Sequence, residues 1–280
     1  MAIDFSCVGQ TVAPVTKRYD WRDVALYALA LGAGENDLAF VLDQPQPKVL
    51  PTYGVLPATE PMFEAAKKTG ANLVQLLHTA QRTELVRPWP AEGEMRTQAT
   101  VRGVWDMKVG ALLIVDTETQ VNGELAAKTS WQLLLRGEGG FGGERPPAGL
   151  RTRAPKDKAP DFEVEVPTSR DQALLYRLTG DINPIHSHPE VAKQAGFDRP
   201  ILHGLCTYGI AGRIALKQFA GAEPARFKAL EAKFSKVVFP GDTLVVRGYK
   251  LDTAGQAAIT VTVKESGEEA ISNCLFEFAP

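Results

Sequence analysis

The chain has 280 residues, of which 31 are basic and 33 are acidic, so its net charge lies close to zero. A chain with so little net charge gives no electrostatic reason to expect nucleic acid or a membrane surface as a partner. Its length is sufficient for two domains of ordinary size with a substantial core.

The three cysteines lie far apart in the sequence and form neither a disulfide framework nor a paired metal-ligand spacing. Such cysteine usage is typical of a reducing compartment. The N-terminus has no basic-then-apolar signal pattern, and no stretch approaches the roughly 20 apolar residues of a membrane helix. The last residues, EFAP, are not an SKL-type address. We therefore expect a cytoplasmic location.

In chain order, the first half begins with a helix and continues with strands. Asp20 is placed to cap a helix over 21–31. Segment 55–73 contains two prolines and a glycine, each unfavourable inside a helix, so we expect no long buried helix there. Alternating apolar residues predict half-buried antiparallel strands over 97–105, 111–121 and 124–136.

A connection follows, because residues 137–160 concentrate glycine, proline and charge without apolar periodicity. We expect an N-terminal unit over 1–140, a linker over 141–160 and a C-terminal unit over 161–280. In the C-terminal unit, Ser169 and Gln172 resemble a capping box for a helix over 170–178, and a longer helix starts at Gly204. Four strands are then predicted, over 228–239, 243–252, 256–264 and 269–278.

The two units repeat one plan. DVALYALALG at residue 23 aligns with DQALLYRLTG at residue 171, an offset of 148, and the same offset aligns Gly93 with Gly241. Two markers at one offset indicate duplication. An antiparallel sheet wrapped around one helix, twice over, is the economical α+β architecture, with the long helix in the second repeat.

One turn carries most of the functional signal. Asp181 and His186 flank Asn183-Pro184, a dipeptide that favours a turn and can bring carboxylate and imidazole together around one water. Free backbone N–H groups at the start of the helix at Gly204 could bind a developing oxyanion. At the offset of 148, Asp181 aligns with Ala33, so the first unit lacks the pair. We expect that unit to leave room for an apolar, elongated ligand instead.

Other interpretations of these residues exist. Asp181, His186, His188 and His203 could form a zinc site, but we predict no metal. His188 has the ordinary role of a surface or capping residue. Cys206 could be a nucleophile, although such a cysteine is more often a small buried helix residue. The GEGGFGG run lacks the context of a phosphate-binding loop, so it is interpreted as a linker or a turn.

The run YRLTGDINPIHSHPEVAKQAGFDRPILHGLCTYG resembles the signature of the hydratase 2 family, the MaoC-like (R)-specific enoyl-CoA hydratases, including the hydratase domain of the multifunctional enzyme of peroxisomal β-oxidation. The resemblance covers nearly the whole chain, through LLHTAQRTELVRPWP, RGEGGFGG and RFKALEAKFSKVVFPGDTL. It implies a double hot-dog fold and the hydration of trans-2-enoyl-CoA to (R)-3-hydroxyacyl-CoA, without a cofactor.

The resemblance also implies roles for single residues. It makes Asp181 and His186 the catalytic pair, Asn183 a supporting residue and Gly204 the oxyanion donor. A second group corresponds to the CoA-thioester site: His78, Phe234 and Lys108, the last being the displaced lysine of the family's Asp-Lys-Gly. His203 is expected either to pack beside the helix start or cap it, or to lie near the thioester.

The sequence leaves two classes of function open. The first is a hydratase or dehydratase of acyl thioesters, carried by CoA or, as the alternative, by acyl carrier protein. The second is a non-catalytic acyl-CoA-binding module that keeps the fold. We expect an acyl-CoA thioester as the partner and a homodimer as a possible assembly. Whether Asp181 or His186 is the acid is open, because the two would titrate as a coupled pair.

Overall fold

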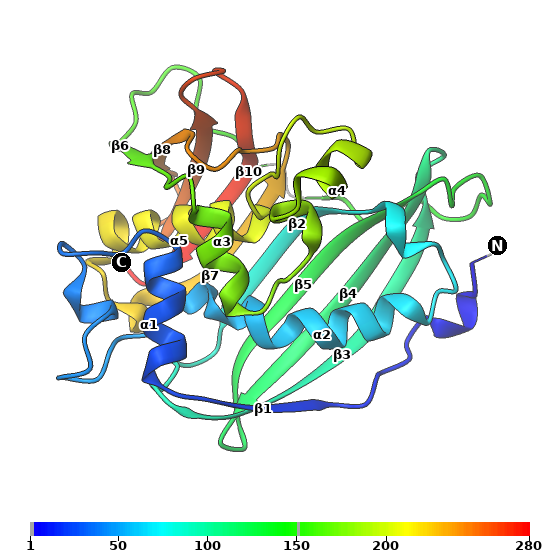
Figure 1. Ribbon diagram of the computed structural model, residues 1–280, viewed down its shortest axis with the longest axis horizontal. Coiled ribbons are helices and arrows are strands. Elements are labelled where there is room, and N and C mark those ends of the chain that lie inside the picture. Colours follow the sequence, from blue (N-terminus) through cyan, green and yellow to red (C-terminus); the bar gives the residue numbers. More distant parts are fainter. Residues whose placement is uncertain (1–2, 150–151) are drawn as a thin grey trace.

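The computed structural model describes residues 3–149 and 152–280, so residues 150 and 151, inside the predicted linker, lie outside the described residues. Helices pack on one side of a curved sheet (Figure 1). The first-half strands are β1 (Val15–Tyr19), β2 (Leu76–Leu85), β3 (Gly93–Asp106), β4 (Gly110–Val121) and β5 (Glu124–Arg136). The second-half strands are β6 (Phe162–Pro167), β7 (Phe227–Phe234), β8 (Thr243–Lys250), β9 (Gln256–Val263) and β10 (Glu269–Phe278). The α-helices are α1 (Trp21–Ala30), α2 (Val55–Lys67), α3 (Gln172–Tyr176), α4 (Pro189–Gln194) and α5 (Gly204–Ala220).

The sheet reveals the duplication directly. Its ten strands run in the order β1-β3-β4-β5-β2-β7-β10-β9-β8-β6, and neighbouring strands are antiparallel. The second five strands repeat the order of the first five in mirror image, with β6 matching β1 and β7 matching β2. The two repeats meet where β2 pairs with β7. The predicted α+β architecture of two sheet-and-helix repeats is confirmed.

The predicted strands are confirmed, with differences at their ends. β3 begins at Gly93, earlier than expected, because its first residues pair with β1. β7 ends at Phe234 instead of 239. The chain after Phe234 leaves the sheet, and the Val238 carbonyl accepts a hydrogen bond from the Leu202 amide at 2.7 Å. This bond fixes the segment that leads into α5.

The start of α1 is capped as expected. The Asp20 carboxylate accepts a hydrogen bond from the Arg22 amide at 2.7 Å, and the Asp23 carboxylate accepts one from the Asp20 amide at 2.9 Å. Both exchanges of a capping box are present. The return bond from Asp23 was not predicted.

The corresponding helix of the second half is shorter than the predicted 170–178. The Gln172 side chain does accept a hydrogen bond from the Ser169 amide at 3.0 Å, as a capping box requires. The chain tightens into a 3-10 turn at Arg177–Thr179 and stops at Gly180, whose φ of 131° suits glycine. The helix therefore ends just before Asp181.

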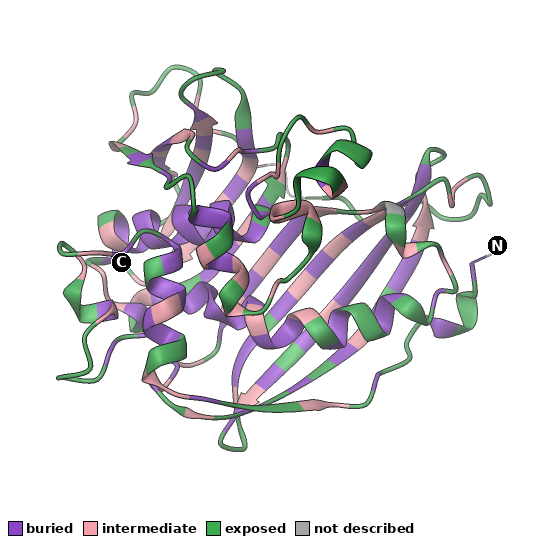
Figure 2. Cartoon of the chain, viewed as in Figure 1, coloured by how far each residue is buried: buried purple, intermediate pink, exposed green. Residues whose placement is uncertain are grey.

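The prediction that 55–73 holds no long helix is wrong. Helix α2 runs for 13 residues with Pro57 in its first turn and Pro61 inside it. Its buried side chains, among them Val55, Ala58 and Met62, recur at helical spacing and pack on the sheet. Packing of that face outweighs the loss of one backbone hydrogen bond at Pro61. Figure 2 shows exposed residues on the opposite face of α2 from the middle of the helix to its end.

Helix α5 is the centre of the core, as predicted. Of its 17 residues, 14 are buried. Gly209 and Gly212 permit close approach to the first half, because an added Cβ would lie 2.6 Å from Leu31 and 2.8 Å from Thr52. Buried Arg213 donates to the Leu31 carbonyl at 3.0 Å, which ties α5 to the end of α1.

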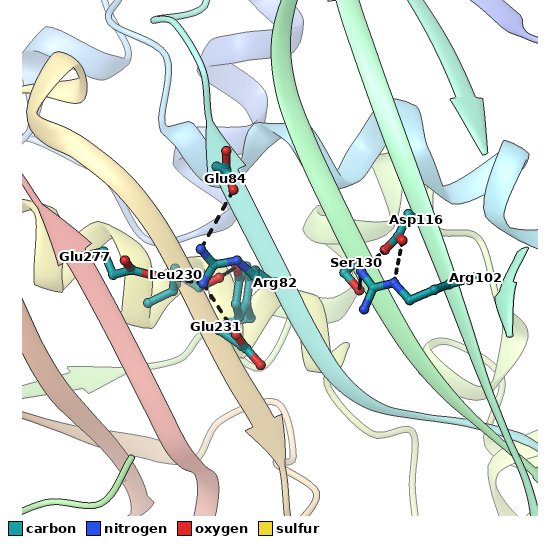
Figure 3. Close-up of polar contacts among 9 residues, drawn as sticks. Arg82, Glu84, Arg102, Asp116, Ser130, Leu230, Glu231 and Glu277 are labelled. Atoms are coloured by element: carbon teal, nitrogen blue, oxygen red, sulfur yellow. Dashed lines mark hydrogen bonds and ion pairs between the residues drawn. The ribbon is translucent and has the colours of Figure 1, made fainter. Parts of the chain in front are cut away.

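Charged side chains cross the β2–β7 junction. Arg82 of β2 lies 3.4 Å from Glu231 of β7 and 2.9 Å from Glu277 of β10 (Figure 3). Arg102 pairs separately with Asp116 across β3 and β4. The Arg82 group therefore links strands of both repeats. Among the described residues, no helix combines the length and apolar character that a membrane crossing needs.

Candidate active site

The Asn-Pro turn brings the predicted pair together. The Asn183 side chain accepts a hydrogen bond from the Ile185 amide at 3.2 Å, and the Asn183 amide donates to the Asp181 carboxylate at 3.2 Å. Pro184 then begins a 3-10 turn that ends at His186. Ligand atoms of Asp181 and His186 lie within 4.8 Å of each other. Two hydrogen bonds of about 2.8 Å to one water span such a separation.

The protonation of His186 is set by its surroundings. Nδ1 lies 2.9 Å from the Ile201 carbonyl oxygen, which can only accept, so Nδ1 carries the proton. The lone pair is left on Nε2. Burial lowers the pKa of His186, and the charge of Asp181 opposes that shift only in part. His186 is therefore a neutral base near pH 7.

His203 contacts both members of the pair. Only 1% of His203 is exposed. Its Nε2–H donates to the backbone carbonyl of Asp181 at 3.0 Å, and its ring stacks on that of His186 with 3.8 Å between the ring centroids. Burial, with the adjacent His186, lowers the pKa of His203 to about 3. Its side chain makes no cap for α5. Of the roles considered from the sequence, packing agrees with these contacts and capping does not.

Gly204 begins the 17-residue helix α5 and is exposed. The first amides of a helix have no intrahelical acceptor, and the helix dipole adds positive potential there. A Cβ on Gly204 would lie 3.4 Å from the Phe234 ring. The ring of Phe234 meets the ring of His78 edge to face, with 4.9 Å between their centroids. The His78 ring in turn stacks on Trp131, again with 4.9 Å between the ring centroids. Gly204, Phe234 and His78 thus gather beside the helix start.

Lys108 lies elsewhere, in the turn between β3 and β4. Its amide donates to Asp106 at 2.6 Å, and the same carboxylate accepts from the Gly140 amide at 2.9 Å and the Gly142 amide at 2.6 Å. Amides of the glycine-rich run therefore bind a carboxylate of the protein, in agreement with an irregular connecting segment. Within residues 3–149 and 152–280, no hydrogen bond or ion pair joins Lys108 to the other predicted site residues.

The donor set is a poor fit to a metal ion. Asp181, His186 and His203 offer ligand atoms within 4.8 Å of one another. The two imidazoles, however, are stacked with planes 28° apart, so their in-plane nitrogen lone pairs do not converge on one ion. Cys206 is fully buried, and burial raises the pKa of its thiol, so it is a packing residue. His188 is exposed at the start of α4 and caps nothing with its side chain.

A groove of about 510 Å³ adjoins the turn and is bordered by Asp181 and Asn183. It lies beside α2, and not in the place of a missing helix. Sequence reasoning did not single out its walls, although the apolar residues that flank Asp181 were a visible signal. The apolar side chains that line it are Leu26, Leu56, Phe63, Met95, Leu178 and Ile182.

Comparison with known proteins places this geometry in a family. Residues 151–271 match the model of the MaoC like domain, and residues 18–137 match that of the MFE-2 hydratase 2 N-terminal domain. The 3-hydroxyacyl-thioester dehydratase Y of Mycobacterium tuberculosis is 41% identical, over 96% of this chain and 95% of that protein. The probable enoyl-CoA hydratase 2 of Dictyostelium discoideum is 38% identical, over 88% of this chain and 86% of that protein.

A solved structure supports the same family assignment. The MaoC-like dehydratase from Phytophthora capsici superimposes with a TM-score of 0.89 at 32% identity, covering 98% of this chain and 97% of that one. A more distant neighbour from Mycobacterium tuberculosis, with a TM-score of 0.57, is described as a double hotdog fold. The chain belongs to the MaoC-like hydratase 2 family.

Proposed function

We propose that the protein is an (R)-specific enoyl-CoA hydratase. It adds water reversibly to trans-2-enoyl-CoA and forms (R)-3-hydroxyacyl-CoA. The observation that carries the proposal is a carboxylate and a neutral imidazole within 4.8 Å of each other at an apolar groove. The relatives named as a hydratase and as a dehydratase fit one scheme, because the two names describe opposite directions of one reaction.

The pair supplies both proton transfers. His186 Nε2 takes a proton from the water as its oxygen bonds to C3, and Asp181 gives a proton to C2. Under this proposal the reactive form of the enzyme–substrate complex is the one in which the pair carries one proton on the Asp181 carboxyl, and the addition leaves that proton count unchanged with the proton on the imidazole. Its return to Asp181 resets the site, and the dehydration direction reverses each transfer. Because one water is held on one face of the alkene, both additions occur on that face and the addition is syn.

The thioester oxygen gains negative charge during the addition. The Gly204 amide at the positive end of α5 is the donor for that oxygen. His78 and Phe234, which gather beside Gly204, line the path of the thioester. His203 positions Asp181 and His186 by its hydrogen bond and its stacking. Lys108 is assigned to CoA through the family's Asp-Lys-Gly alone, since its described contacts are with Asp106 in the β3–β4 turn.

The two repeats divide the work under this proposal. The unit over 161–280 carries the catalytic residues, and the unit over 1–140 accommodates the acyl tail, with 141–160 as the linker. No step requires a metal or a redox cofactor. CoA is favoured over acyl carrier protein as the carrier. A cytoplasmic location and a homodimer complete the proposal, and light scattering of the purified protein tests the dimer.

A direct assay tests the activity. Purified protein is mixed with crotonyl-CoA, with a longer trans-2-enoyl-CoA and with crotonyl-acyl carrier protein, and loss of the conjugated thioester is followed by absorbance. We expect hydration of both CoA substrates, at an undiminished rate after dialysis against a chelator. A non-catalytic binding module would bind these thioesters without turnover, and a carrier-protein enzyme would prefer the third substrate.

Variants of the pair test the mechanism. Asp181→Asn and His186→Ala should each lower kcat by at least roughly 100-fold, and the double variant should be little worse than either. Non-additivity is expected because the two side chains act on one water. If either single variant retains more than about half of the wild-type turnover, the pair is misassigned.

A further inference from the structure

The groove beside the catalytic turn has walls from β1, α1, α2 and the turn itself (Figure 1). Asp181 lines it, so a tail attached to a thioester at that residue can enter directly. Three apolar side chains in its walls are exposed to solvent: Phe63 by 38%, Leu178 by 61% and Ile182 by 68%. Clustered apolar residues left open to solvent are typical of a ligand contact surface.

An ion pair joins two of these walls. The Lys17 ammonium on β1 lies 2.7 Å from the Glu60 carboxylate on α2. Both residues line the groove. Within residues 3–149 and 152–280, this is the one ion pair whose two members both do so. The pair therefore bridges the groove from the edge of the sheet to the helix above it.

Lys17 lies on the face of β1 that also carries a buried residue. Side chains alternate along a strand, so Lys17 shares its face with Tyr19, which is only 6% exposed, although the Lys17 side chain itself is half exposed. A charge on an edge strand can serve solely to prevent edge-to-edge association. That simpler role gives Lys17 no influence on substrate choice, and it predicts aggregation when the charge is removed.

We propose that the Lys17–Glu60 ion pair closes the acyl groove and sets the longest acyl tail that the enzyme binds well. This inference rests on the proposed function and deepens it. Each methylene buried against apolar walls strengthens binding by roughly fourfold. A tail that reaches the ion pair gains nothing further, because it must stop there or strip water from two charges. Both side chains are about half exposed, so the fold does not depend on the pair.

The test compares two double variants of matched chemistry. Lys17→Met with Glu60→Met removes both charges, keeps the length of the side chain at residue 60 and shortens the one at residue 17 by a single atom. Lys128→Met with Glu118→Met removes a similar exposed pair, 2.9 Å apart on β5 and β4 and outside the groove. For each protein, kcat/KM is measured for trans-2-enoyl-CoA from C4 to C16. Binding of saturated C8 and C16 acyl-CoA is measured by calorimetry, which does not depend on turnover.

We expect the ratio of kcat/KM for C16 to that for C8 to rise about tenfold in the Lys17/Glu60 variant, the gain of one to two further buried methylenes. The binding ratio should rise in parallel, and the Lys128/Glu118 variant should match the wild type. Equal ratios in all three proteins would overturn the proposal. Should the double variant aggregate, Glu60→Gln alone is compared with the wild type in the same way.

The same experiment separates the two levels of inference. If no protein hydrates any substrate but the binding ratio still changes in the Lys17/Glu60 variant, the activity is wrong and the groove assignment stands. If hydration proceeds and neither ratio changes, the activity stands and the ion pair does not limit the tail.

Discussion

Replacing Gly204 with proline isolates the contribution of one backbone amide. Proline removes the N–H that we assign to the thioester oxygen, and little else. The first position of a helix favours proline, since its amide has no intrahelical partner. The preceding residue must be extended, and His203 already is, with φ −57° and ψ 130°. The fold should therefore tolerate the change.

The expected loss follows from the chemistry of oxyanion donors. Removing one such donor lowers kcat by roughly 100- to 1,000-fold. Proline also adds side-chain carbon, and Gly204→Ala controls for that. A Cβ at this position lies 3.4 Å from the Phe234 ring, which is close to an ordinary van der Waals contact, so the alanine variant should fold and keeps the amide.

The assay compares kcat of both variants at saturating crotonyl-CoA, together with their thermal midpoints. Gly204→Pro should have a midpoint close to that of Gly204→Ala and a kcat at least roughly 100-fold lower. A folded proline variant with more than half of the kcat of the alanine variant would show that this amide does not bind the developing charge.

Three further predictions concern pH and the β2–β7 junction. Because burial lowers the pKa of His186, the acidic limb of the kcat/KM profile should fall below the ordinary histidine value of 6.5, and a limb above it would contradict the neutral-base assignment. His203 has a pKa of about 3 when folded, so its contribution to stability is full above pH 6.5 and is lost as pH falls toward 3. At pH 5 the loss is about 2 kcal/mol, and His203→Gln should flatten that part of the urea-unfolding profile; an unchanged slope would refute it. Arg82→Met leaves Glu231 without its counter-charge, so it should lower the free energy of unfolding in urea by about 1–2 kcal/mol. Arg102→Met removes a more exposed pair and should lower it by less than about 1 kcal/mol. Equal losses would count against the role of the β2–β7 junction in stability.

The sequence predicts seven of the ten strands and the catalytic turn, because these depend on local signals, whereas β1, β2 and β6 were not predicted. Period-two alternation located β4, β5 and β10 almost to the residue. The Asn183-Pro184 dipeptide was sufficient to place Asp181 near His186, since the turn is closed by hydrogen bonds within five residues.

What the sequence did not predict depends on packing between distant segments. Propensity argued against α2, but its buried face is stabilised by the sheet, and no local rule measures that contribution. The proton position on His186 depends on the carbonyl of Ile201, 15 residues away. The groove is lined by Lys17 and Glu60, which the fold brings together from separate elements. No local sequence motif marks contacts of this kind.

Stereochemistry tests the central claim most directly. The wild-type protein is incubated with trans-2-decenoyl-CoA, and the 3-hydroxyacyl product is released and resolved by chiral chromatography. Water held by Asp181 and His186 on one face of the alkene predicts a single enantiomer, and membership of the hydratase 2 family identifies it as the (R) product. A predominantly (S) product, or a racemic one formed at the enzymatic rate, would contradict the account.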